Sequence, residues 1–192
     1  MNQPECFVIV HSTSRVAKDC TDSLSRQGWT YKISPAVDGW KITSEDWQNI
    51  GIAMSTTGKM WRRPGAQGCW FSHWNLWQYC IKNNCPIVIM EHDAMVTAPW
   101  PTDLDIQPKI VKLYKTAECK NKPVTGTYSK GSHAYTLTPA QATQIVDHCR
   151  KNGAVAVDKQ LADGVVSWRF YDRDLVVLNP KRGKSTTSPK RI

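Results

Sequence analysis

The sequence lacks the features that mark a disulfide-rich secreted protein, a zinc finger or a membrane-spanning chain. Its seven cysteines include no Cys-x-x-Cys pair, so neither a disulfide framework nor a zinc-ligand spacing is evident. The apolar run at 7–10 is too short for the hydrophobic region of a signal peptide. No apolar stretch approaches the ~20 residues of a membrane span. We therefore expect a reduced, cytoplasmic protein.

Acidic residues are also few relative to basic ones. The chain has 25 lysines and arginines against 16 aspartates and glutamates, a formal net charge of +9. A length of 192 residues favours one domain, which we place at 1–180, followed by a basic, flexible tail at 181–192. Such a tail is either simply solvated or a contact for phosphate-rich partners such as nucleic acid. Its basic residues are Lys181, Arg182, Lys184, Lys190 and Arg191.

Short apolar runs alternate with helical patterns along the chain. The run Phe7–Val10 is typical of a strand buried on both faces of a parallel sheet. A helical pattern at 15–27 ends at Gly28, and 29–33 alternates as a second strand. This opening predicts an α/β fold. Further helices are expected at 44–52 (capped by Ser44), 67–82 and 138–151 (cap Thr138, then Pro139), strands at 86–90, 109–114, 131–137 and 174–178, and loops at 54–66 and 117–130.

Tryptophan is unusually frequent, with nine in the chain. A tryptophan combines a large apolar area with one hydrogen-bond donor, so it serves a core, a sugar-stacking surface or an interface equally well. The sequence leaves both the core and the ligand-facing interpretation open. Six of the nine gather in one part of the chain: Trp29, Trp40, Trp47, Trp61, Trp70 and Trp74.

The strongest chemical candidate is the triplet Glu91-His92-Asp93, which directly follows an apolar run. Alternate residues at a strand end point the same way, so two carboxylates there can face one Mg²⁺ or Mn²⁺. Such a cation is suited to stabilising the charge of a leaving diphosphate. Acidic residues after a strand also often just begin a loop, so the triplet alone is a weak indication.

Together with Gly68-Cys69-Trp70-Phe71-Ser72-His73, the triplet resembles the signature of glycosyltransferase family 25. This family comprises lipopolysaccharide-type sugar transferases and collagen galactosyltransferases. Its pattern has Glu-Asp-Asp and a small residue where this chain has Glu91-His92-Asp93 and Ala94. The resemblance runs from about Phe7 to Ser188 and also involves Arg15, Ala36-Val37-Asp38-Gly39, the segment from Gly131 to Ala140, and Val157-Asp158.

The resemblance implies a single GT-A-like, nucleotide-sugar-binding domain with a mostly parallel sheet flanked by helices. It implies a metal at Glu91, His92 and Asp93, where ligation by the His92 ring would favour Mn²⁺ over Mg²⁺. Asp158 is the first candidate for the general base, with Asp163 as the fallback. The donor pocket would be formed by Arg15, Asp38, Gly68, Ser72, His73 and Glu91, with Arg62 and Arg63 closing over the diphosphate.

Several of these residues also have purely structural interpretations. Ser72 and His73 would hydrogen-bond the donor or orient a carboxylate, and their structural interpretation is a polar pair that ties the helix to the sheet. Asp38 is typical of a turn, and Asp158 is a suitable helix cap. Cys69 is interpreted as a small core residue rather than a nucleophile.

The expected activity is that of a metal-dependent hexosyl- or pentosyltransferase. It would use a nucleoside diphosphate sugar, with a UDP-sugar favoured, and Mn²⁺ or Mg²⁺. The acceptor hydroxyl would belong to a glycan or to a hydroxylated base in DNA, the latter motivated by the basic tail. The alternative follows from His92 in place of an aspartate: a catalytically degenerate transferase fold that acts as a nucleic-acid or glycan-binding module.

Overall fold

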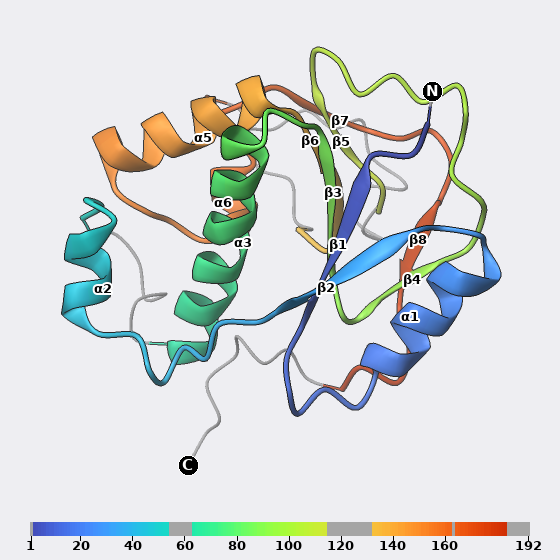
Figure 1. Ribbon diagram of the computed structural model, residues 1–192, viewed down its shortest axis with the longest axis horizontal. Helices are drawn as coiled ribbons and strands as arrows, with labels where there is room; N and C mark the ends of the chain where they lie inside the picture. Colours follow the sequence, from blue (N-terminus) through green and yellow to red (C-terminus); the bar gives the residue numbers. More distant parts are fainter. Residues whose placement is uncertain (1, 54–62, 115–131, 163, 184–192) are drawn as a thin grey trace.

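The computed structural model describes residues 2–53, 63–114, 132–162 and 164–183 (Figure 1). Parts of the sequence-based predictions lie outside these residues. They are the loop at 117–130, most of the loop at 54–66, Trp61, Arg62, Gly131, Asp163 and the tail residues 184–192.

A six-stranded sheet forms the centre of the molecule, in the order β2-β1-β3-β6-β5-β7. Strand β1 pairs in parallel with β2 and β3, and β5 pairs in parallel with β7. Strand β6 is antiparallel to both of its neighbours. The expected α/β fold with a mostly parallel sheet is thus confirmed. The strands are β1 (Glu5–Val10), β2 (Tyr31–Pro35), β3 (Ile87–Glu91), β5 (Ile110–Lys112), β6 (Ala134–Leu137) and β7 (Trp168–Phe170), with a separate antiparallel pair β4 (Ala94–Val96) and β8 (Val176–Leu178).

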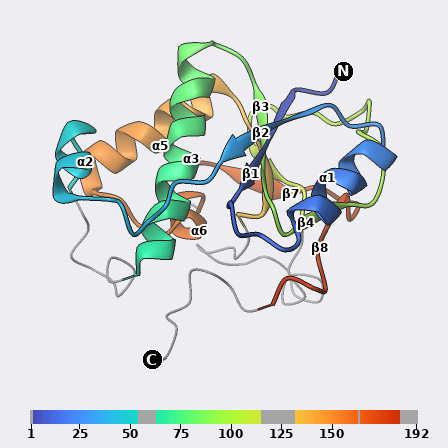
Figure 2. The same ribbon diagram turned by 60° about the horizontal axis from the view of Figure 1, so that its bottom comes forward.

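Helices cover both faces of the sheet. Helices α2, α3, α5 and α6 lie on one side, and α1 lies on the other beside β4 and β8 (Figures 1 and 2). Within the described ranges, no helix is both long enough and apolar enough to cross a bilayer. The helices are α1 (Ala17–Arg26), α2 (Ser44–Asn49), α3 (Pro64–Lys82), α5 (Pro139–Asn152) and α6 (Val157–Gln160).

The core has two layers because alternate strand residues face opposite sides of the sheet. In β1, Phe7 and Ile9 pack against the side of α3 and α5, and Cys6 and Val8 pack against the side of α1. The tryptophans are not all in the core, because Trp40 is 84% exposed. The core interpretation applies to Trp29, Trp47, Trp70, Trp74 and Trp77, all of which are buried.

Three helix starts or caps differ from their predictions. Helix α1 begins at Ala17 rather than at residue 15. The cap of α2 is Thr43 rather than Ser44, because Thr43 and Asp46 form a capping box. Helix α3 begins at Pro64 instead of residue 67, since proline suits the first helical position. The predicted start of α5 is confirmed, with Thr138 as its cap.

Three elements of the structure were not predicted from the sequence. They are β4, β7 and α6, each of three or four residues, which is too short for a periodic pattern to develop.

Candidate active site

The site lies at the carboxyl ends of three neighbouring parallel strands. Arg15 follows β1, Asp38 follows β2, and Asp93 follows β3. Because β2, β1 and β3 are adjacent and parallel, the segments that leave them emerge at one edge of the sheet. This is the edge at which open α/β sheets usually bind ligands.

The two motif segments at 36–39 and 68–73 are packed against each other. A Cβ atom on Gly68 would lie 2.4 Å from the Val37 carbonyl oxygen, and one on Gly39 would lie 1.6 Å from the Pro64 carbonyl oxygen. Ser72 Oγ donates to the Gly68 carbonyl at 2.7 Å and accepts from the Val37 N–H at 2.9 Å. Gly68 and Ser72 therefore join α3 to the end of β2, in line with the structural interpretation of Ser72.

His73 is fully buried and its ring is held from one side. Its Nδ1 lies 2.8 Å from the Tyr135 hydroxyl, which also accepts a hydrogen bond from Trp77 Nε1 at 2.9 Å. Its Nε2 lies 3.5 Å from Glu91 Oε1. His73 therefore faces a carboxylate, one of the two roles that the sequence allowed for it.

Glu91 is contacted by polar groups of the two residues just before β6. Its Oε1 accepts from the Ser132 hydroxyl at 2.8 Å, and its Oε2 lies 3.5 Å from His133 Nδ1. The antiparallel register, in which Met90 opposes Ala134, brings residue 133 opposite Glu91. The Glu91 N–H accordingly donates to the His133 carbonyl at 2.8 Å.

Asp93 joins this group from the turn after β3. Its Oδ1 lies 3.3 Å from His133 Nδ1, and its Oδ2 lies 3.3 Å from Arg182 Nη1. Its carbonyl accepts from the Asn179 N–H at 2.8 Å, which places the segment after β8 against the site. Arg182, assigned to the tail from the sequence, is therefore part of this site. We call Glu91, Asp93, His73, Ser132 and His133 the carboxylate cluster.

The charges in the carboxylate cluster shift one another's proton affinities. Burial alone would raise the pKa of Glu91, but the nearby imidazoles of His133 and His73 hold it well below its usual range. The pKa of Asp93 is likewise lowered, mainly by His133, although burial alone would raise it. Burial would lower the pKa of His133, but Glu91 and Asp93 raise it to about 10. At neutral pH the cluster therefore holds two carboxylates around an imidazolium.

Three buried atoms of the carboxylate cluster have no hydrogen-bond partner among the described residues: His73 Nε2, His133 Nδ1 and Asp93 Oδ1. The contacts between them bring charges close but do not satisfy hydrogen-bond geometry. Unpaired buried polar atoms are costly and rare in folded proteins. The unpaired atoms of Asp93 and His133 fit a cation, because Glu91, Asp93 and His133 each offer a ligand atom within 4.8 Å of the others.

The third potential ligand is His133, a residue to which the sequence analysis assigned no role. His92 stands between the two acidic residues, but its ring belongs to neither group of potential metal ligands among the described residues. The signals for His133 in the sequence were its place inside the strand predicted at 131–137 and inside the resembling segment from Gly131 to Ala140. The pairing of that strand with β3 could not be inferred from them.

The remaining predicted residues lie around this centre. Arg15 is exposed in the loop between β1 and α1, and Asp38 accepts from the Trp40 N–H at 3.0 Å in a turn. Asp158 is in the first turn of α6. Its charge, together with those of Glu91 and Asp93, adds to the effect of burial in raising the pKa of Cys69. Asp158 therefore lies within electrostatic range of the site.

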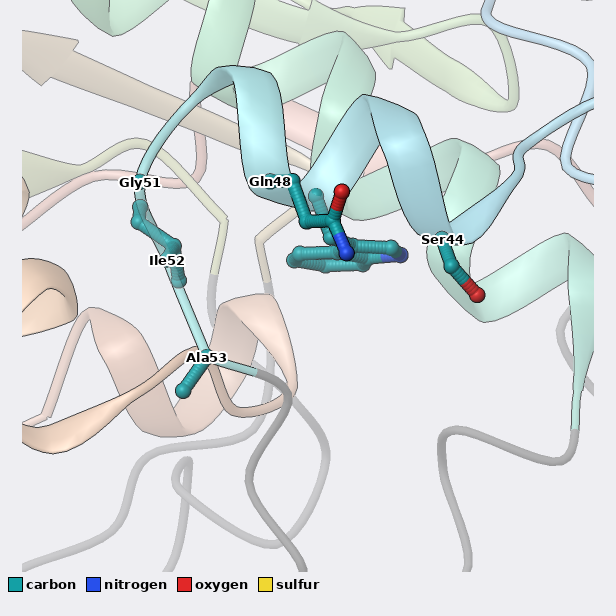
Figure 3. A pocket seen from close by; sticks show the side chains of 6 residues that line it. Ser44, Gln48, Gly51, Ile52 and Ala53 are labelled. Carbon is teal, nitrogen blue, oxygen red and sulfur yellow. The ribbon is translucent and has the colours of Figure 1, made fainter.

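A pocket of about 350 Å³ lies elsewhere, between α2 and the residues that follow it (Figure 3). Its lining holds no ionisable side chain and none of the predicted site residues. It consists of Ser44, Trp47, Gln48, Gly51, Ile52 and Ala53.

The protonated His133 predicts a pH dependence of stability in the metal-free protein. A histidine whose folded pKa of about 10 exceeds its ordinary 6.5 stabilises the fold below pH 6.5, and this contribution disappears as the pH rises through 10. We expect a loss of roughly 2–3 kcal/mol across this interval, since each pKa unit corresponds to about 1.4 kcal/mol and the side chain is partly exposed. Urea unfolding at several pH values measures it.

The matched variants are His133→Gln and His148→Gln. The first should flatten the dependence between pH 6.5 and 10. The second should leave it intact, because burial and Lys151 lower the pKa of His148, so that it titrates below this interval. An unchanged slope in His133→Gln would contradict the assignment of the imidazolium.

Comparison with known proteins agrees with the resemblance over part of the chain. Residues 15–102 match the model of glycosyltransferase family 25, described as an LPS biosynthesis protein. No curated protein matches the chain. The match includes the segments at 36–39, 68–73 and 91–94, and it ends before those at 131–140 and 157–158.

Two solved structures of the glycosyltransferase GlyE from Streptococcus pneumoniae TIGR4 are similar to the chain. The first has 11% identity and a TM-score of 0.49, with coverage of 90% of this chain and 46% of that chain. The second, an apo form, has 12% identity and a TM-score of 0.49, with coverage of 88% and 45%. The chain thus spans less than half the length of these proteins. Over residues 15–102, which include Glu91 and Asp93, this chain is therefore similar to glycosyltransferase family 25.

Proposed function

We propose that the chain transfers a sugar from a nucleoside diphosphate donor to an acceptor hydroxyl, with Mn²⁺ or Mg²⁺ bound against the diphosphate. The observation that carries the proposal is the set of unpartnered buried atoms beside Glu91, within the family match. Two carboxylates and an imidazole that lie close together, with polar atoms that lack hydrogen-bond partners, form a suitable cation site.

The metal would be held by Glu91, Asp93 and His133. His92 stays a predicted ligand from the sequence. Two oxygen ligands and one nitrogen favour Mn²⁺ over Mg²⁺. The bound metal supplies Lewis-acid stabilisation of the charge that develops on the leaving diphosphate. Arg182, whose guanidinium lies 3.3 Å from Asp93, adds a cation of the type that binds phosphate oxygens in pairs.

The other predicted residues take three kinds of role in this proposal. Arg15 and Asp38 would contact the nucleoside part of the donor, because both follow strands that end at the ligand-binding edge. Gly68 and Ser72 would hold α3 against β2, and His73 would orient Glu91. Asp158 would take the proton of the attacking hydroxyl as general base.

The acceptor is the least constrained part of the proposal. A glycan acceptor agrees with the description of the matched family. A nucleic-acid acceptor was motivated by the basic tail, but two of its basic residues already face carboxylates of the chain. Lys181 Nζ lies 3.5 Å from Asp19, and Arg182 faces Asp93. We therefore favour a glycan.

Thermal unfolding with UDP-, GDP-, CMP- and TDP-sugars, each with and without Mn²⁺, tests the proposal. A donor present at ~100 times its dissociation constant adds roughly 2.7 kcal/mol, or about 5–10 °C for a domain of this size. We expect such a shift for one nucleotide, a UDP-sugar, and only when the metal is present. The absence of a metal-dependent shift with any donor would contradict the proposal.

A further inference from the structure

A second group of potential ligands shares Glu91 but points toward α3. Cys69 and His73 are four residues apart on this helix and therefore lie on the same face. One ligand atom from each of Cys69, His73 and Glu91 lies within 4.8 Å of the others. Within the described residues, Cys69 is the one thiol that belongs to such a group.

His73 has the arrangement of a metal ligand that lacks its metal. Its side chain is 0% exposed, and its Nε2 has no hydrogen-bond partner among the described residues. Its Nδ1 lies 2.8 Å from the Tyr135 hydroxyl. Ligating histidines commonly use their other ring nitrogen in this way, which fixes the ring and directs the free nitrogen at the ion.

We propose that Cys69, His73 and Glu91 form a site for a thiophilic divalent cation, Zn²⁺, distinct from the one at Glu91, Asp93 and His133. One sulfur, one nitrogen and one oxygen ligand, with a fourth position left open, is a set that zinc accepts. The other group has no sulfur and suits Mn²⁺ or Mg²⁺ instead. Binding converts the Cys69 thiol to a metal-bound thiolate and releases its proton to solvent.

The shared Glu91 makes the two sites compete. A Zn²⁺ ion bound to Cys69 and His73 would withdraw Glu91 from the metal that serves the sugar donor. Zinc should therefore inhibit transfer, and Cys69→Ser should relieve that inhibition. This consequence rests on the proposed function, whereas the existence of the zinc site does not.

Cobalt titration of the full chain, reduced and free of metal, tests the site directly. One equivalent of Co²⁺ should produce a sulfur-to-cobalt charge-transfer band that Zn²⁺ abolishes by displacement. Cys69→Ser should lose this band and bind Zn²⁺ at least about 100-fold more weakly, because the loss of a ligand costs no less than the loss of an outer partner. Cys85→Ser, beyond the C-terminal end of α3, should retain it.

Asp93→Asn separates this proposal from the proposed function. It removes a ligand of the other group only, so the charge-transfer band should persist. A charge-transfer band in a protein that transfers no sugar would support the zinc site and contradict the proposed transferase function. No band in the wild type, or an unchanged band in a folded Cys69→Ser protein, would overturn the zinc site.

Discussion

Replacing Asp93 by asparagine is expected to reduce sugar transfer by at least about a hundredfold. Asparagine keeps the shape of the side chain but removes one of the two charges that face the proposed metal. Lewis-acid stabilisation by a bound metal supplies several kcal/mol, and each ~1.4 kcal/mol corresponds to a tenfold change in rate. Initial rates at saturating donor, measured over a range of Mn²⁺ concentrations, provide the comparison.

The matched control is Asp147→Asn, which removes the same charge from an exposed position on α5. It should transfer sugar at the wild-type rate. The Asp93→Asn protein must also be folded, because its substitution removes a partner of His133 and Arg182. A folded Asp93→Asn variant with nearly normal transfer would show that this carboxylate has no part in the reaction.

The second large effect is expected for stability, from Gly39→Ala. The new methyl group would lie 1.6 Å from the Pro64 carbonyl oxygen and 3.0 Å from the Gly68 backbone nitrogen. Both atoms belong to the backbone of α3, so no side-chain rotation relieves the clash, and the backbone of the turn or of the helix must shift. Overpacking typically costs 1–3 kcal/mol. Because the obstruction here is backbone, we expect about 3 kcal/mol or more, measured by urea unfolding.

Gly28→Ala is the matched control because it isolates the backbone cost of losing glycine. Gly28 has a φ of +69°, and no atom lies within 4 Å of its added Cβ. We expect a loss of about 1–2 kcal/mol there, from the left-handed conformation alone. A cost at Gly39 no greater than that at Gly28 would contradict the tight contact between α3 and the turn after β2.

Local patterns were sufficient to predict most of the framework. The run at 87–90 is buried on both faces of the sheet, as its continuous apolar character indicates. Thr138 and Pro139 begin α5 as predicted, because a cap and a first-turn proline act within one turn of the chain. Period-two alternation likewise accounts for the assignment of Phe7 and Val8 to opposite layers of the core.

The motif residues show where local information ends. Gly68 and Ser72 were assigned to the donor pocket from the sequence, and in the structure the backbone around Val37 lies beside both. Both residues could be recognised in the sequence as parts of a motif. The segment against which they pack could not be predicted, because it depends on where α3 crosses the chain after β2.

The α/β framework and the pair Glu91 and Asp93 were predictable from local patterns, because strand runs, caps and alternate residues act over a few positions. The surroundings of that pair depend on the tertiary structure. His133 arrives through the antiparallel pairing of β6 with β3, and Arg182 arrives from 89 positions further along the chain. His73 reaches Glu91 across the interface between α3 and the sheet. Such contacts arise from the pairing and packing of whole elements, which local sequence patterns do not predict.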